Sequence, residues 1–374
     1  MGLPLLEALQ TGLDSWFARS TSELADDPLR PLPGERSVAL QKQIAALGVP
    51  LPLRAFVGEA LREAVEAWRS DPEAPNVLIV LSRPVEPVSA LIEAVLAERD
   101  PPFSARQALL PCHRRPVDPD AVPRMLIAAL DGSQPPALDT GEPVLLSLPN
   151  LDQCFLRCIG GWSGIERLRQ VILERRDRFW LLGCNRWAWR FLDHVSQISS
   201  YFPDARSLPA LDGPQLRQWL TPLASGLGLQ QSASGGHPST DADQDPEVDQ
   251  WSQLAALAGG GPRIAAALWL ESLRLESNSD GAEMRQVRPA LPDLPSLTDV
   301  DRYILHSLLI HGTMRLEHLA FGLGLPSHRL QPRIHWLLGE GLIEAKAGEL
   351  SVQPSHYPGL VKALDDNNFF TGEA

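Results

Sequence analysis

The sequence predicts an α/β protein with a parallel sheet, followed by a smaller unit of three helices and a hairpin. Continuous apolar runs at residues 77–81, 143–150 and 179–185 are typical of strands that are buried on both faces. Each run precedes a segment with the apolar spacing of a helix, and strands that alternate with helices favour a parallel sheet. From residue 296 the pattern changes to three helices and two short strands, which is the order of a winged helix-turn-helix.

The composition limits the classes of function. The chain has 374 residues, enough for two or three domains, and a formal net charge of −13. Proteins that coat nucleic acid neutralise phosphates with Lys and Arg, so this charge argues against that class and favours a basic protein partner. The N-terminus lacks the features of a signal peptide, and no apolar run reaches about 18 residues. We therefore expect a cytoplasmic protein without membrane insertion.

Cysteine and histidine give little sign of a metal site or a disulfide framework. The four cysteines form no CxxC pair in a chain of this length. Cys154 and Cys158 lie four residues apart on an expected helix, and we interpret them as ordinary buried thiols rather than a metal pair. Six of the nine histidines lie after residue 300, without the spacing of zinc ligands, so we expect no metal.

The elements follow in order along the chain. Helical spacing separated by proline-rich loops predicts N-terminal helices at residues 5–17, 37–47 and 53–68. The sheet is expected to contain strands at residues 77–81, 108–110, 145–148, 179–185 and 205–208, with a last helix at 213–223. Residues 248–275 are predicted to be helical, with a break at the glycines and proline of 259–262.

These elements define six expected segments. Two stretches rich in polar residues, glycine or proline are interpreted as linkers between the folded parts. The expected organisation is an N-terminal helical segment at 1–70, an α/β domain at 71–224, a flexible linker at 225–249, a helical lid at 250–276, a second linker at 277–295 and the winged helix at 296–374.

The segment between the first strand and its helix has the frame of a phosphate-binding loop without its chemistry. A Walker A loop reads G-x-x-x-x-G-K-[ST], and the residues here are SRPVEPVS. Ser82 and Pro87 stand in place of the two glycines, and Val88 stands in place of the lysine that contacts the β- and γ-phosphates. Ser89 keeps the metal-binding hydroxyl. Because Pro87 lacks a backbone N–H and Glu86 adds a negative charge, we expect ATP to bind poorly or not at all.

A second position leads to the same expectation. A Walker B strand ends in an acidic pair, which binds magnesium and polarises water. Here Pro149 and Asn150 follow the strand at 145–148, so both carboxylates are absent. Asp152 lies in the next turn, where we predict that it caps the following helix. Two losses at separate positions predict that the chain does not hydrolyse nucleotide.

This order of motifs resembles the AAA+ and STAND ATPases with a C-terminal winged helix, and it is similar in layout to their origin-recognition branch, over roughly residues 60–374. The resemblance implies a P-loop-type sheet with a helical lid. It places Asn185 at the sensor-1 position and Arg263 at the sensor-2 position. The alternatives are a turn-forming asparagine and a solvated arginine at a helix start. Arg206 is either an arginine finger that acts on a neighbour or a surface arginine.

The winged helix offers a second candidate surface. Its third helix carries His328, Arg329 and Arg333, and its wing carries Lys346. These residues would contact DNA or a protein partner. Residues 297–374 contain nine acidic and six basic residues, a net charge of −3. That is little positive charge for phosphate contacts, so a protein contact is favoured.

We therefore expect a catalytically inactive AAA+-like scaffold or regulatory subunit, without a cofactor, that assembles with a protein partner. The expected partner is an active P-loop ATPase. The alternatives are a DNA-binding regulator that uses the winged helix, and an ATPase with a divergent site. The sequence contains no GxSxG, HExxH or paired Cys–His signature of another catalytic class.

Overall fold

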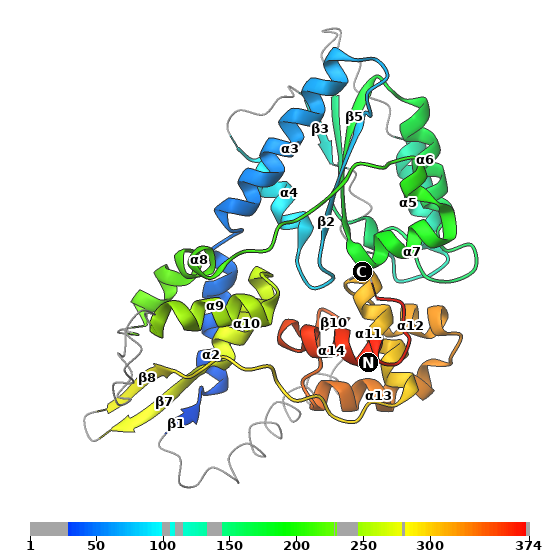
Figure 1. Cartoon of the computed structure of the whole chain (residues 1–374). Helices are drawn as coiled ribbons and strands as arrows, with labels where there is room; N and C mark the ends of the chain where they lie inside the picture. The colour runs from blue at the N-terminus through cyan, green and yellow to red at the C-terminus, as the bar shows by residue number, and fades with distance from the viewer. Residues whose placement is uncertain are drawn as a thin grey trace.

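The computed structural model describes residues 29–98, 105–108, 115–132, 144–227, 229, 246–278 and 281–371. These residues form three groups in Figure 1. The sheet and its helices are at the top, a helical group with a small sheet is at the lower left, and a second helical group is at the lower right. The helix expected at 5–17, the end of the strand expected at 108–110 and most of the linker expected at 225–249 lie outside the described residues.

The expected parallel sheet is confirmed and has five strands. Their order is β3-β4-β5-β2-β6, and every pairing between them is parallel. The bounds are Val77–Ser82 for β2, Ala105–Ala108 for β3, Val144–Leu148 for β4, Arg178–Asn185 for β5 and Ala205–Ser207 for β6. All residues of β2 and β5 are buried, as their continuous apolar sequences predict. Since the strands are parallel, their carboxyl ends meet at one edge of the sheet.

Helices cover both faces of this sheet (Figure 1). On one side lie α3 (Leu51–Ser70) and α4 (Val88–Leu96), and on the other lie α5 (Ala121–Gly132), α6 (Ser163–Glu174) and α7 (Arg186–Ser196). The buried side chains of α3 recur at helical spacing, so one stripe of the helix faces the core. The segment expected as a separate N-terminal unit at 1–70 is therefore divided, because α3 belongs to the layer on the sheet.

One stretch near the start of the described chain meets a criterion for a membrane span. The stretch Gly34–Ser70, which comprises α2 (Gly34–Ala46) and α3, is long and apolar enough to cross a membrane by length and composition alone. A core helix of a soluble protein meets the same criterion, and α3 packs on the sheet.

Cys154 is disulfide-bonded, so its interpretation as an ordinary thiol is wrong, whereas Cys158 and Cys184 are free.

The helical group at the lower left of Figure 1 joins distant parts of the chain. It contains α2, α8 (Gly213–Gly226), α9 (Pro246–Ala258) and α10 (Pro262–Glu271). It also contains an antiparallel sheet of β1 (Leu29–Pro31), β7 (Leu273–Asn278) and β8 (Gly281–Gln286), in the order β1-β7-β8.

This small sheet corrects three predictions. Residues 277–295 are not simply a linker because they include β8, the helical lid expected at 250–276 ends in β7, and the N-terminal helical segment expected at 1–70 contains β1. The alternation of Leu273 and Leu275 with polar residues is a strand pattern too short to distinguish from the end of a helix. Its partner β1 lies far earlier in the chain, so local sequence carries no sign of the pairing.

The C-terminal unit, residues 296–371, has the expected order of elements. Three helices, α11 (Asp299–His311), α12 (Leu316–Leu323) and α13 (Ser327–Gly339), precede an antiparallel hairpin of β9 (Ile343–Lys346) and β10 (Glu349–Val352). A short turn, η4 (Pro354–His356), and a helix, α14 (Tyr357–Asp365), follow. Thr298 caps α11, since its hydroxyl accepts a hydrogen bond from the Asp301 N–H.

Candidate functional site

The carboxyl edge of the sheet collects the positions that the sequence singled out. Ser82 at the end of β2 is the register partner of Asn185 at the end of β5. Pro149 follows β4, and its carbonyl lies so close to β5 that a Cβ on Gly183 would stand 2.3 Å from it, which explains the glycine. The edge is the usual place for a ligand in an open parallel sheet. The groups that pack against the carboxyl edge therefore determine whether a ligand can bind there.

The loop between β2 and α4 is closed on itself. The Ser82 hydroxyl donates to the Glu86 carbonyl oxygen at 3.0 Å, and the Glu86 N–H donates to the Arg83 carbonyl oxygen at 3.0 Å. Pro87 is exposed, Val88 is buried in the core and Ser89 is half-buried at the start of α4. Because the serine hydroxyl and this N–H are used within the turn, the loop does not present the row of free N–H groups that cradles a phosphate.

The Glu86 carboxylate binds the N-terminus of α10. It accepts hydrogen bonds from the Arg263 N–H at 3.1 Å and from the Ile264 N–H at 3.3 Å. These N–H groups have no partner inside the helix, and the helix dipole favours a negative charge there. Burial raises the pKa of Glu86, although the two N–H groups and the nearby arginines oppose this shift. A Cβ on Gly261 would lie 2.6 Å from the Glu86 Oε1 atom, so this approach requires glycine.

Two arginines strengthen the same contact. The Arg83 guanidinium donates to the Gly259 carbonyl oxygen, which precedes α10. The Arg263 side chain turns back to the Val85 carbonyl oxygen at 3.2 Å and forms an ion pair with Glu344 of β9 at 3.5 Å. The alternative of a solvated Arg263 is therefore wrong in part, since its guanidinium joins the loop, α10 and the C-terminal unit.

We predict that Glu86→Ala destabilises the protein by about 1–2 kcal/mol, the usual effect of losing a helix cap. The α10 N–H groups would lose their acceptor, and the helical group would be held less firmly on the sheet. Urea unfolding at neutral pH measures the change. Glu98→Ala, at an exposed position beyond α4, is the matched control and should alter stability by less than about 0.5 kcal/mol. Equal stability of the two variants would contradict the role of Glu86.

The end of β4 lies against a buried polar cluster. Asp152 is buried beside Arg115, which donates through one Nη to the Asp152 carbonyl oxygen and through the other to the Thr313 carbonyl oxygen, both at 2.6 Å. Burial raises the pKa of Asp152 to about 6, against the attraction of Arg115, and lowers the pKa of Arg115 to about 10. The prediction that Asp152 caps a helix is wrong: η2 (Leu151–Gln153) has no side-chain cap, and the carboxyl group belongs to this cluster.

The same edge binds the C-terminal end of α11. The Asn185 amide donates to the Ile310 carbonyl oxygen at 2.9 Å, and the Gln153 amide donates to the His311 carbonyl oxygen at 2.8 Å. With the Arg115 bond to Thr313, three side chains of the α/β part satisfy carbonyl groups at the end of a helix, where intrahelical partners are missing. Asn185 also accepts from the Ala188 N–H at 2.8 Å, which makes it the N-cap of α7.

Two histidines extend this contact. His311 accepts a hydrogen bond at Nε2 from the Arg157 N–H at 3.2 Å, and burial holds its pKa well below the usual range. His318 of α12 lies 2.6 Å from the Pro116 carbonyl oxygen through Nε2 and accepts from the Arg315 N–H at Nδ1, so its Nε2–H is the donor to Pro116. Gly312 follows α11 at φ 68°, and a Cβ there would stand 2.9 Å from the Asp152 carboxylate.

The structure thus brings together Ser82, Pro149, Asn150, Asn185 and Arg263 around two helix ends. The sequence did not predict the contacts that this edge of the sheet makes with α10 and α11. Glu86 was recognised only as an unfavourable charge, because its partner α10 lies 177 residues further on. Arg115 and Gln153 were missed as well, since neither belongs to a motif and both act through α11.

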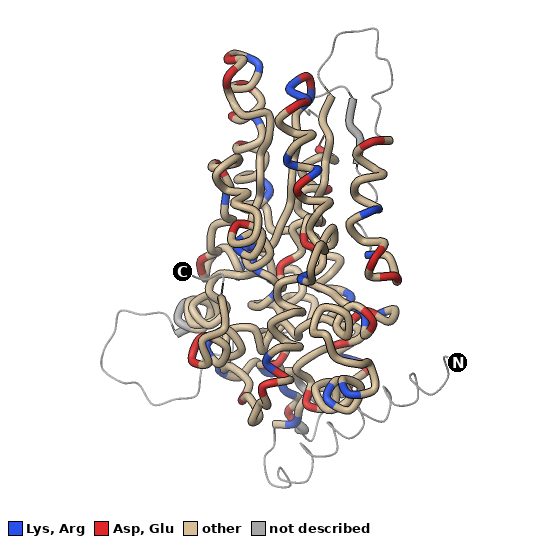
Figure 2. Tube along the Cα trace, turned by 90° about the vertical axis from the view of Figure 1, so that its right-hand side faces the viewer, with Lys and Arg blue, Asp and Glu red and all other residues tan. Residues whose placement is uncertain are grey.

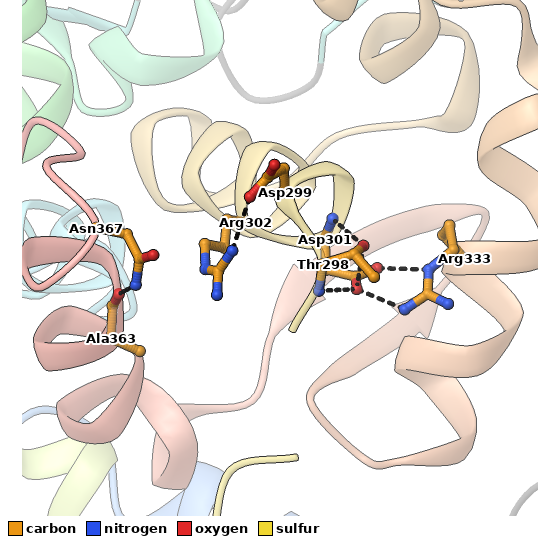
Figure 3. A network of polar contacts seen from close by, with 7 residues as sticks. All are labelled: Thr298, Asp299, Asp301, Arg302, Arg333, Ala363 and Asn367. Atoms are coloured by element: carbon orange, nitrogen blue, oxygen red, sulfur yellow. Dashed lines mark hydrogen bonds and ion pairs between the residues drawn. The ribbon is translucent and has the colours of Figure 1, made fainter. Parts of the chain in front are cut away.

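The proposed DNA or partner residues on the C-terminal unit divide into two pairs. Arg333 forms a bidentate ion pair with the fully buried Asp301, with an Nε–Oδ1 distance of 2.7 Å, and Figure 3 shows this pair beside Thr298. Lys346 forms an ion pair with Glu344 at 2.7 Å. His328 and Arg329, in contrast, are exposed on α13. Of these four residues, Arg333 and Lys346 are therefore ion-paired within the chain, although the Lys346 side chain is 71% exposed.

No protein-family model matches the chain, and no curated protein matches it. Similar solved structures include a mutant of RuvB from Thermotoga maritima, with 16% identity, 85% of this chain and 95% of that chain covered, and a TM-score of 0.32. The ORC2 protein of Aeropyrum pernix, in ADPNP–ADP complexes, has 14% identity, coverage of 85% and 94%, and a TM-score of 0.36. A STAND protein with a tetratricopeptide repeat sensor from Pyrococcus horikoshii has 11% identity, coverage of 82% and 45%, and a TM-score of 0.29.

These identities and TM-scores are low, so the function must be inferred from the residues of this chain. Fold and site together define a class: an α/β protein with a five-stranded parallel sheet. The carboxyl edge of this sheet is bound by the start of α10 and by the end of α11.

Proposed function

We propose that the chain is a catalytically inactive AAA+-like scaffold or regulatory subunit that assembles with an active P-loop ATPase. The observation that supports this most is the pair of helix ends at the carboxyl edge. The positive N-terminus of α10 meets the Glu86 carboxylate, and the carbonyl groups at the end of α11 meet donors from Asn185, Gln153 and Arg115. The α/β part thus supplies an acceptor to the N–H groups at the start of α10 and donors to the carbonyl groups at the end of α11.

A nucleotide would have to displace these contacts. The α- to γ-phosphates carry negative charge, so Glu86 would repel them, and Val88 offers no charge at the place where a Walker A loop supplies a lysine. Undocking α11 would expose the carbonyl groups at its end together with the buried Arg115 and Asp152. The fold would then be kept in one closed arrangement without nucleotide, which suits a subunit that offers a surface and performs no chemistry.

The proposed organisation moves α3 from the expected N-terminal segment to the α/β part and adds the small sheet to the helical group. The α/β part spans α3 and about residues 71–212, the helical group with α8 acts as a lid, and residues 296–374 form a winged helix. Figure 2 shows basic and acidic residues interspersed along the described chain, unlike the basic track that binding to a phosphate backbone uses. We place the protein in the cytoplasm, with no cofactor and no membrane insertion.

The alternative of a DNA-binding regulator rests on few residues. His328 and Arg329 are exposed on α13, but Arg333 and Lys346 are ion-paired within the chain. Contacts to bases and phosphates would need cations that are free to reach them. For this reason we favour a protein partner for the exposed face of α13.

The proposal predicts that the purified protein does not bind ATP. Isothermal titration calorimetry with ATP and Mg²⁺ at low salt should give no heat above dilution, for the wild type and for Ser89→Ala alike. Circular dichroism of both proteins checks that they are folded. Saturable, magnesium-dependent binding by the wild type that Ser89→Ala weakens would show a working site and end the proposal of an inactive subunit.

A further inference from the structure

The residues after α14 lie on a surface made by two other helices. Asp365, Asp366, Asn367 and Asn368 are exposed, and Asn368 has a left-handed backbone with φ 58°. The chain then reverses into the segment Phe369–Thr371, which we call the FFT segment. It contacts α7 of the α/β part and α11 of the C-terminal unit, so it spans two groups of the structure.

The surface binds both the backbone and the rings of the FFT segment. One Nη of Arg190 donates to the Thr371 carbonyl oxygen at 3.0 Å, and its guanidinium lies 4.9 Å from the centre of the Phe370 ring. His306 lies 2.7 Å from the Phe370 carbonyl oxygen through Nε2. The second nitrogen, Nδ1, faces the Arg157 guanidinium at 2.9 Å and accepts its hydrogen bond, which makes Nε2–H the donor to Phe370.

The rings take edge contacts on the same surface. Phe369 lies 5.0 Å from the Tyr303 ring and 5.3 Å from the His306 ring, and both pairs are T-shaped. Phe370 lies 6.4 Å from His194. Donors to two successive carbonyl groups, with aromatic contacts for two successive rings, are the features of a site that binds a short peptide segment.

The segment is also tied to the end of α14, where the Phe369 N–H donates to the Leu364 carbonyl oxygen at 3.0 Å and the Thr371 hydroxyl donates to the Asp365 carboxylate at 3.4 Å. Phe369 is half-buried, Phe370 is 37% exposed, and the three residues that connect them to α14, Asp366, Asn367 and Asn368, are exposed. Charge is complementary, since Asp365 and Asp366 precede the segment and Arg190 and Arg157 lie on the surface that receives it. An acidic segment with two adjacent aromatic residues from another protein would meet the same donors and rings.

We propose that the α7–α11 surface, formed by Arg190, His194, Tyr303 and His306, is a binding site for an acidic peptide segment of a partner protein that carries two adjacent aromatic residues. The FFT segment occupies this site within the chain and competes with the partner. Its effective concentration beside the site is about millimolar, as for other short connections, so a partner segment binds the intact chain weakly. The proposed peptide site does not depend on whether the loop at residues 82–89 binds nucleotide.

The test uses a fluorescent peptide with the sequence of Asp365–Thr371 and the full chain in several forms. Fluorescence anisotropy should show the peptide binding to the F369A/F370A variant at least ten times more tightly than to the wild type, because the competing rings are absent. Adding Arg190→Ala to that variant should weaken binding at least tenfold. Adding Arg206→Ala, at an exposed arginine of β6, removes the same charge elsewhere and should leave binding unchanged.

The controls separate the possible outcomes. A peptide with both phenylalanines replaced by alanine should not bind, and circular dichroism must show that each variant is folded. No binding to the folded F369A/F370A variant, or equal loss with Arg190→Ala and Arg206→Ala, would overturn the proposal. A wild-type dimer that grows with concentration and is absent in F369A/F370A would overturn the assignment to another protein, with a second copy of this chain as the occupant.

Discussion

Replacing Arg115 by alanine is expected to lower the free energy of unfolding by about 3–5 kcal/mol, the usual effect of removing one partner of a buried charged pair. Arg115 is 3% exposed and donates to the carbonyl oxygens of Asp152 and Thr313. Without it, two buried carbonyl groups lose a strong donor and the Asp152 carboxyl group loses the cation that opposes its raised pKa. The end of α11 would then keep the hydrogen bonds from Asn185, Gln153 and the Arg157 N–H but lose the charged donor.

Urea unfolding at pH 7, followed by tryptophan fluorescence, measures this loss. Hydrogen exchange should show the largest gain in the C-terminal unit, because the contact that Arg115 makes to Thr313 joins that unit to the α/β part. Arg124→Ala is the matched control: its side chain is 70% exposed and its ion pair with Asp118 spans 3.5 Å. The control should change stability by less than about 1 kcal/mol. Similar losses in both variants would show that Arg115 has no special role.

Patterns with local causes predicted most of the sheet. The apolar runs of β2, β4 and β5 are buried on both faces, and each is followed by amphipathic sequence, so periodicity was enough to place them. The same holds for α11 to α13, where Thr298 and Gly324 mark a helix start and a helix end. In these elements the residues that decide the structure are neighbours in sequence.

The contacts that close the carboxyl edge could not be predicted in this way. Glu86 and α10, and Asn185 and Ile310, are separated by more than 100 residues. Each side chain has an ordinary local interpretation, as a loop carboxylate or a turn-forming asparagine. Their partners are main-chain groups at helix ends, which leave no side-chain signature in a sequence. The loss of the Walker residues is visible in the sequence, but the contacts that occupy the edge instead are not.

The second large effect expected is a pH dependence of the C-terminal unit, where burial lowers the pKa of His306, His311, His318 and His356. Of these four, His306 is the histidine that donates to the FFT segment. Burial lowers the pKa of His306 to about 4, and its Nδ1 atom faces the Arg157 guanidinium, which disfavours a second proton. Its Nε2–H donates to the Phe370 carbonyl oxygen. The neighbouring Phe369 ring packs against the Tyr303 ring. In the unfolded chain the histidine has its ordinary pKa of about 6.5.

The sign follows from proton binding. Between pH 6.5 and 4 the unfolded chain binds a proton at His306 and the folded chain does not, so acidification favours unfolding. A shift of the pKa from 6.5 to about 4 corresponds to about 3 kcal/mol lost over this range. Asp152 acts in the opposite direction, because its folded pKa of about 6 lies above its ordinary value of 3.8, and acidification from pH 6 to 4 therefore favours the folded state. Glu86 and Glu271, whose pKa values are also raised, add to this opposition.

Two variants separate the opposing groups. Asp152→Asn removes the main carboxyl group that offsets the histidine, so stability should fall more steeply from about pH 6.5 to 5 than in the wild type. His306→Gln should remove about 2 kcal/mol of the loss over the same range, whatever its effect at pH 7. His328→Gln, at an exposed position on α13, should keep the wild-type slope.

Urea unfolding at pH 7, 6 and 5 gives these slopes, and a His306→Gln slope equal to that of the wild type would exclude His306 as the group that responds. Because His306 joins the FFT segment to Arg157, protonation of its ring places a second positive charge against the guanidinium. This repulsion should release the FFT segment before the sheet opens. Exchange of the α14 amides should therefore rise at a higher pH than exchange of the sheet amides.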